Sequence, residues 1–277
     1  MGLFGNSEGG GSRLGGTLIL GLIMAAFTLF QYYSKSELNP ITKETQHIGI
    51  STDEEIAMGL QSAPQMAQEF GGLYEDDQAQ QMVDQVGQRV AQNSAAKRTP
   101  YKYDFHLLAD PNVVNAFALP GGQVFITYAL FSRLESEEQL AGVLGHEIGH
   151  VVARHSAQRI ADQQLTDGLT GAAVLATGDQ NTAQMAQMVG NMINMKYGRG
   201  QELQSDELGV RFMLEAGYEP EGLLGVMKIL EEASGGQRVP EFQSTHPSPE
   251  NRMERIKDAI QKYKSLKGTR GDSDLSE

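Results

Sequence analysis

The most informative pattern in this chain lies in His146-Glu147-Ile148-Gly149-His150. Four residues turn an α-helix by about 400°, nearly one full circuit, so the two histidine side chains point the same way. Two imidazoles presented in this manner can bind one metal ion, and the carboxylate beside them can activate a water molecule. The pattern therefore predicts a helix that presents a zinc site.

The residues around this stretch are those of an amphipathic helix. Ser136 and Gln139 have the spacing of a capping box at a helix N-terminus. His155 lies nine residues after His146, half a turn away from the ligand face, so we do not count it as a ligand. The pattern as a whole is typical of zinc peptidases. Apolar residues recur at helical spacing, at Leu140, Val143, Leu144, Ile148, Val151 and Val152.

A third metal ligand must come from elsewhere in the chain, because zinc in a catalytic site takes three protein ligands and leaves one position for water. The sequence has no cysteine, so the third ligand is His, Asp or Glu. The segment 201–209 reads as the start of a helix and offers Glu202 and Asp206. One carboxylate can bind the metal while the other orients a ligating imidazole. Alone, this pair is also typical of a solvated helix face.

Together these segments resemble the HtpX and CaaX-protease-related gluzincins, peptidase family M-forty-eight. The similarity includes Asn115–Gly122 and Thr245–Arg252, and it extends from about Ser51 to Lys262 in the expected order. The resemblance implies a zincin-like α+β fold, mostly α-helical, with a small β-sheet beside the zinc helix. Relatives commonly have alanine where this chain has Ser205, and some have several membrane spans where this chain has room for one.

The resemblance also implies a role for each residue of the site. It implies that His146, His150 and Glu202 bind one Zn²⁺ per chain, and that Glu147 is the general base. Asp206 then orients a ligating imidazole.

Further roles are implied outside the two helices. His246 and Arg252 are candidate donors to the oxyanion of the tetrahedral intermediate. His246 could instead occupy the open zinc position and hold the enzyme inactive, or be a surface residue before a proline turn. An edge strand that holds the substrate as an added strand is assigned to Asn115, Ala116, Phe117 and Ala118. The alternative for these residues is a plain loop.

Composition agrees with one enzyme domain behind a membrane anchor. The net charge of −13 over 277 residues argues against binding to nucleic acid, which requires a basic surface. We divide the chain into a short polar tail (1–13), a transmembrane anchor (14–33), a linker (34–50), a zinc metallopeptidase domain (51–265) and a flexible polar tail (266–277).

The anchor is predicted from an uncharged segment near the N-terminus. No charged residue occurs from Leu14 to Tyr33, a length that can just span a lipid bilayer. A cleaved signal peptide is the alternative, because the apolar core has only about thirteen residues. No small-x-small cleavage site follows it, which favours a single-pass anchor. The export of similar proteins implies a catalytic domain outside the cytoplasm, on the periplasmic side in a bacterium.

Other elements are predicted from local pattern. Helices are expected over 53–70 and 76–94, and strands over 101–109 and 122–128, where apolar residues alternate. The apolar segment Leu165–Thr177 is too short to span a membrane, so we expect a helical hairpin or a lid over the cleft.

The function implied by the resemblance is that of a membrane-anchored zinc endopeptidase in protein quality control. Its substrates are then unfolded or extended polypeptides from damaged membrane or envelope proteins. The alternative is a membrane-tethered chaperone or assembly factor whose zinc site is structural or latent.

Overall fold

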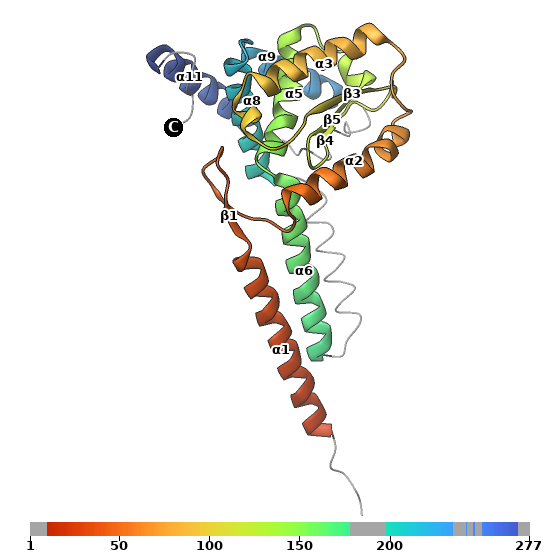
Figure 1. The fold of residues 1–277 in the computed structure, drawn as a ribbon, viewed down its shortest axis with the longest axis vertical. Coiled ribbons are helices and arrows are strands. Elements are labelled where there is room, and N and C mark those ends of the chain that lie inside the picture. The colour runs from red at the N-terminus through yellow and green to blue at the C-terminus, as the bar shows by residue number, and fades with distance from the viewer. Residues whose placement is uncertain (1–9, 178–197, 235–241, 243–245, 247–250, 271–277) are drawn as a thin grey trace, which may run out of the picture. The chain divides into compact units, whose positions relative to one another are not determined.

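The computed structural model describes residues 10–177, 198–234, 242, 246 and 251–270 of the chain (Figure 1). The mostly helical α+β architecture predicted from the sequence is confirmed. By its internal contacts the chain divides into two compact units. The smaller unit comprises Met1–Leu38, Thr45–Gly49 and Gln158–Met195, and the larger unit comprises Asn39–Glu44, Ile50–Ala157 and Lys196–Glu277.

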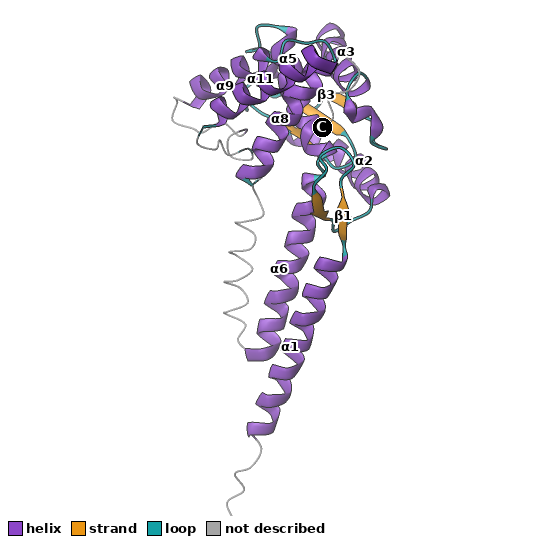
Figure 2. Cartoon of the chain, turned by 90° about the vertical axis from the view of Figure 1, so that its left-hand side faces the viewer, coloured by secondary structure: helices purple, strands orange, loops and turns teal. Residues whose placement is uncertain are grey.

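Two helices form most of the smaller unit. Helices α1 (Gly10–Ser34) and α6 (His155–Thr177) run side by side in opposite directions (Figures 1 and 2). Small residues line their contact: a Cβ on Gly21 would lie 2.7 Å from the backbone oxygen of Ala172, and one on Gly168 would lie 2.5 Å from a side chain of α1. Small residues allow helix backbones to approach this closely.

Leu165–Thr177 is the C-terminal half of α6, and the chain does not reverse direction within it. The hairpin expected here does not form within this segment, because α6 continues unbroken to Thr177. Residues 178–197 lie outside the described part of the chain.

Helix α1 includes the predicted anchor. Its segment Gly15–Ser34 has 20 residues and a mean hydropathy of 1.5, enough in length and composition to cross a membrane. An N-terminal signal sequence has the same properties. Large apolar side chains of α1 are exposed, among them Leu22 and Phe30 at 62% and 70%.

The predicted linker over 34–50 contains a β-hairpin. Strand β1 (Ser36–Leu38) pairs antiparallel with β2 (Thr45–His47). The Asn39 side-chain oxygen accepts hydrogen bonds from the backbone N–H groups of Ile41 and Thr42, which stabilises the turn. Strands of three residues are too short to show an alternating pattern, so the hairpin was not predicted.

A three-stranded sheet lies in the larger unit. Strand β5 (Gln123–Thr127) is central, parallel to β3 (Asp104–Leu108) and antiparallel to β4 (Ala116–Ala118). The strands predicted on either side of β4 are confirmed, with shorter ends. Strand β4 lies at an edge of the sheet, so residues 116–118 form a strand rather than a plain loop.

The two predicted helices before the sheet are confirmed to within two residues. Helix α2 (Thr52–Glu69) begins at a capping box of Ser51 and Glu54, and α3 (Asp77–Gln92) begins at the N-cap Asp76. The remaining described elements are η1 (Ala95–Arg98), α4 (Tyr128–Phe131), α5 (Glu137–Val152), α8 (Arg199–Glu215), α9 (Glu221–Ser234) and α11 (Arg252–Arg270). Helix α11 therefore includes the start of the predicted tail over 266–277.

Helix α5 is at the centre of the larger unit, where it contacts α3, α8, α9 and β4 (Figure 1). Every residue from Gln139 to Val152 is buried. The predicted capping box forms only in part. The Ser136 hydroxyl accepts from the N–H of Gln139, but the Gln139 side chain accepts from the N–H of Glu135.

Candidate metal centre

Helix α5 presents three ionisable side chains in the interior. His146, Glu147 and His150 are all buried. The Nε2 atoms of the two histidines lie 3.1 Å apart. The spacing of four residues thus gives the shared helix face that the sequence predicts.

Glycines let α8 approach α5 closely. A Cβ on Gly149 would lie 3.0 Å from the backbone oxygen of Ser205, and one on Gly209 would lie 3.1 Å from the backbone nitrogen of His146. A side chain at either glycine would push the helices apart. Their close contact brings Glu202 of α8 to the two histidines of α5.

The Glu202 carboxylate contacts both histidines. Its Oε1 is 3.4 Å from His150 Nε2, and its Oε2 is 3.5 Å from His146 Nε2. His246 joins the same cluster, with Nδ1 at 3.0 Å from Glu202 Oε1 and 3.4 Å from His146 Nε2. Metal-binding atoms of all four residues lie within 4.8 Å of one another.

These four side chains fit a four-coordinate metal ion. Donor atoms about 2.0–2.1 Å from zinc at the corners of a tetrahedron are about 3.3 Å from one another. The distances of 3.0 to 3.5 Å within the cluster agree with that value. In addition, Glu202 Oε2 and both carboxylate oxygens of Glu147 are buried with no hydrogen-bond partner among the described residues. Buried polar atoms are rarely left in this state, and a cation with a water molecule would satisfy them.

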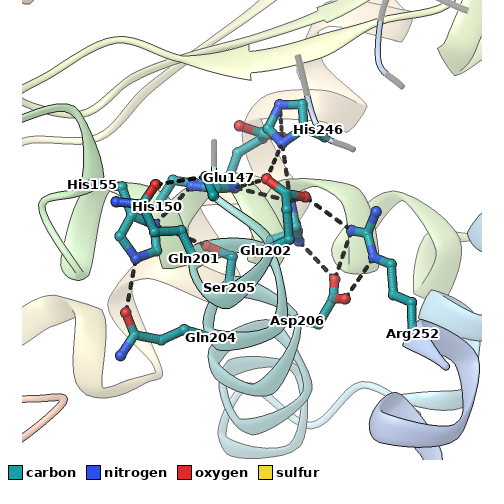
Figure 3. A network of polar contacts seen from close by, with 12 residues as sticks. Glu147, His150, His155, Gln201, Glu202, Gln204, Ser205, Asp206, His246 and Arg252 are labelled. Carbon is teal, nitrogen blue, oxygen red and sulfur yellow. Dashed lines mark hydrogen bonds and ion pairs between the residues drawn. The ribbon is translucent and has the colours of Figure 1, made fainter. Parts of the chain in front are cut away.

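Asp206, the second carboxylate that the sequence offered, lies beside His146. Its Oδ1 lies 2.9 Å from His146 Nδ1, which leaves Nε2 facing the cluster. Arg252 donates to this carboxylate from Nε at 2.6 Å and from Nη2 at 2.9 Å (Figure 3). Burial alone would raise the pKa of Asp206, but the guanidinium holds it below its ordinary value. The buried carboxylate therefore stays ionised.

The two residues predicted near the C-terminal end reach different parts of the site. His246 Nε2 lies 3.8 Å from Glu147 Oε1. Arg252 reaches Glu202 as well as Asp206, with Nη2 at 3.5 Å from Glu202 Oε2. The contacts of Arg252 are thus with the carboxylates of α8. Residues 243–245 and 247–250, on either side of His246, lie outside the described residues.

The predicted substrate strand lies beside the zinc helix. Strand β4 contacts α5, and its Ala116 and Ala118 are buried. Phe117 stacks on Phe125 with ring centroids 4.9 Å apart. Asn115 precedes the strand, and its side-chain oxygen is buried with no hydrogen-bond partner among the described residues.

His155 lies against the site although it was not predicted there. Its Nδ1 is 2.8 Å from His150 Nδ1. On one continuous helix it would point half a turn away from the ligand face, but Arg154 has a φ of 56° and separates α5 from α6. A left-handed arginine has no sequence signal comparable to a glycine. The break, and with it this contact, could not be predicted.

A His-Glu-x-x-His helix, a carboxylate from a second helix and a small sheet beside them define the zincin-like class of metallopeptidases. This chain belongs to Peptidase family M48, whose sequence pattern matches residues 77–260.

Individual relatives come from bacteria and from mitochondria. The Beta-barrel assembly-enhancing protease of Yersinia pestis is 31% identical over 214 residues, which are 74% of this chain and 43% of the relative. The Mitochondrial metalloendopeptidase OMA1 of Schizosaccharomyces pombe is 28% identical over 245 residues, 87% of this chain and 71% of the relative. Metalloprotease YcaL of Escherichia coli is 29% identical over 234 residues, which are 76% of this chain and 89% of the relative. The chain thus spans less than half of the first of these relatives.

Proposed function

We propose that this chain is a membrane-anchored, zinc-dependent endopeptidase that hydrolyses unfolded or damaged membrane and envelope proteins. The observation that supports it most directly is the buried cluster of His146, His150 and Glu202 beside the Glu147 carboxylate, which has no hydrogen-bond partner among the described residues. A structural metal site has no use for such a carboxylate, whereas peptide hydrolysis requires a base.

The three clustered side chains hold one Zn²⁺ per chain. A zinc ion held there supplies Lewis acidity, which polarises the scissile carbonyl and makes water nucleophilic near neutral pH. His146 and His150 bind through Nε2, the atoms that face Glu202. Asp206 and Arg252 keep His146 in the orientation that this requires.

Glu147 is the general base. It takes a proton from the attacking water and later passes it to the leaving amine. Burial raises the pKa of this carboxyl above its ordinary value, although His246 and His146 oppose the shift. A raised pKa makes Glu147 a stronger base, and it also allows the protonated form to act as an acid later in the cycle.

His246 closes the fourth position of the site at rest. Support for this comes from its Nδ1 atom, which lies at ligand-to-ligand distance from both Glu202 and His146. The alternative role, donation to the oxyanion, requires that the imidazole leave this position. His246→Ala separates the two: basal cleavage rises if the side chain closes the site and falls if it is a donor. Unchanged cleavage contradicts both roles.

Substrate binds as an added strand along Asn115, Ala116, Phe117 and Ala118. Strand β4 is an edge strand in contact with the zinc helix, and pairing at an edge reads the substrate backbone more than its side chains. Extended or unfolded segments suit this mode. The names of the relatives, a beta-barrel assembly-enhancing protease and a mitochondrial metalloendopeptidase, agree with a role in protein quality control.

The bilayer contact is made by residues 14–33. The exposed apolar side chains of α1 support a retained anchor, because water does not favour such a surface. The catalytic domain then lies outside the cytoplasm, on the periplasmic side if the cell is bacterial.

Glu147→Gln tests the proposal, because it removes the base and leaves the zinc ligands in place. We expect zinc binding to persist and cleavage of an unfolded substrate such as casein to be lost. The matched control is Glu137→Gln, the same change at the exposed start of α5. It should leave cleavage unchanged.

The second candidate is a membrane-tethered chaperone or assembly factor, favoured by the closed position of His246. Full cellular complementation by Glu147→Gln would contradict proteolysis as the function that matters. Proteolysis would also be contradicted if the wild-type protein bound stoichiometric zinc but cleaved nothing, and the His246→Ala variant cleaved nothing either.

A further inference from the structure

A chain of hydrogen bonds leads from His150 to the surface of the larger unit. His155 Nδ1 lies 2.8 Å from His150 Nδ1, and His155 Nε2 lies 2.8 Å from Gln204 Oε1 (Figure 3). Gln204 Nε2 in turn lies 2.7 Å from Glu44 Oε2. The two histidines are buried and Glu44 is exposed. The proposed mechanism uses neither His155 nor Gln204.

Metal binding by His150 fixes the donor and the acceptor in each of these hydrogen bonds. A neutral imidazole that offers its Nε2 lone pair to a metal has its proton on Nδ1. That proton points at His155 Nδ1, which therefore accepts, so His155 has its own proton on Nε2. This second proton is donated to Gln204 Oε1, and the Gln204 amide nitrogen then donates to the Glu44 carboxylate. Because a carboxylate only accepts, the outer end requires the same direction as the metal end.

The conformation of the backbone between α5 and α6 places His155 beside His150. Arg154 is left-handed, a conformation that costs an L-residue roughly 1–2 kcal/mol. Buried contacts hold it there: Nε lies 2.8 Å from Glu55 Oε2, and Nη2 lies 3.0 Å from the backbone oxygen of Ile50. The strained residue is thus fixed by an ion pair, and its consequence is the contact between His155 and His150.

We propose that His155 is a positioning residue that fixes the tautomer and ring orientation of His150 for metal binding, and that Gln204 holds His155 in turn. Metal-binding histidines commonly donate their other N–H to an oriented acceptor. This inference rests on the proposed function only in that His150 binds a metal. It does not require proteolysis.

The test compares two substitutions of His155 in the full chain. His155→Phe keeps a planar ring and removes the acceptor. His155→Asn places an amide oxygen near the position of Nδ1 and keeps it. Zinc affinity, measured by competition with a chromophoric chelator, should fall about 10–100-fold in the phenylalanine variant. The asparagine variant should recover most of this loss.

A spectroscopic measurement separates positioning from a packing defect. Co²⁺ bound in place of zinc has visible bands that respond to the geometry of its ligands. We expect altered bands in His155→Phe and bands close to those of the wild type in His155→Asn. Wild-type zinc affinity in the phenylalanine variant would overturn the inference. So would equal losses in both variants.

Gln204 provides a second pair of variants if His155→Phe does not fold. Gln204→Leu removes the acceptor for His155 Nε2–H at a half-buried position, whereas Gln204→Glu retains an acceptor there. The leucine variant should lose several-fold in zinc affinity, less than the loss at His155, and the glutamate variant should lose less. If both Gln204 variants bound zinc as tightly as the wild type, the proposed role of these hydrogen bonds would be overturned.

The two hypotheses can fail separately. Zinc affinity that depends on His155 in a protein that never cleaves casein would contradict the proposed function and leave the inference in place. Cleavage of casein with zinc affinity independent of His155 would contradict the inference alone.

Discussion

His146 and His150 are equivalent in the sequence pattern, yet the fold gives them different surroundings. His146 Nδ1 faces Asp206, an ionised carboxylate held by Arg252. His150 Nδ1 faces His155, an imidazole held by Gln204. One histidine is therefore in contact with an ionised carboxylate and the other with an imidazole.

The difference appears in the pKa values of the two histidines. Burial alone would lower both. The carboxylates of Asp206 and Glu202 nevertheless raise the pKa of His146 to about 9. Burial keeps the pKa of His150 well below its ordinary value, although Glu202 acts in the opposite direction. In the metal-free protein at neutral pH, His146 is therefore protonated on both ring nitrogens, whereas His150 is neutral. The motif alone does not distinguish them.

The largest effect is expected from removing the charged support. Asp206→Ala leaves the buried guanidinium of Arg252 without its main partner, which should lower the free energy of unfolding by about 3–5 kcal/mol. Denaturant unfolding of the metal-free protein measures this.

A double variant is the control for that experiment. Asp206→Leu together with Arg252→Leu removes both charges, so stability should largely return while zinc affinity stays low. A loss below about 1 kcal/mol in Asp206→Ala would show that the charged support is not needed for folding.

An intermediate effect is expected from pH. Protonated His146 has no lone pair for a metal, so apparent zinc affinity should fall about tenfold, or about 1.4 kcal/mol, for each pH unit below 9. Zinc uptake at neutral pH should release about one proton, from His146. Calorimetric titration in buffers of different ionisation enthalpy counts this proton. Release of two would show that His150 is also protonated and would remove the difference between the two histidines.

The smallest effect is expected at Ser205. Its Oγ lies 3.4 Å from His155 Nδ1, a weak contact beside the much shorter one to His150. Ser205→Ala should change the free energy of unfolding by less than about 1 kcal/mol and leave zinc affinity nearly unchanged. A tenfold loss of zinc affinity would show that Ser205, rather than Gln204, sets the orientation of His155.

Much of the fold followed from local pattern. Helices α2 and α3 and strands β3 and β5 were predicted from local composition and apolar alternation, which depend on residues close together in the sequence. The hairpin of β1 and β2 was missed, since its turn depends on side-chain bonds of Asn39. Leu165–Thr177 is helical, but it continues α6 without reversing and packs against α1, a helix distant in sequence.

The site divides in the same way. Spacing along the sequence was enough to place His146, Glu147 and His150 together on a helix, since helix geometry depends only on spacing. Glu202 and Asp206 were also identified as candidate carboxylates of the metal site, although the role of each was assigned from the family resemblance. The side chain that contacts Nδ1 of each histidine depends instead on tertiary contacts. The close packing of α8 at Gly149 and Gly209 and the left-handed Arg154 act between segments far apart in the chain, and such contacts leave no periodic signal.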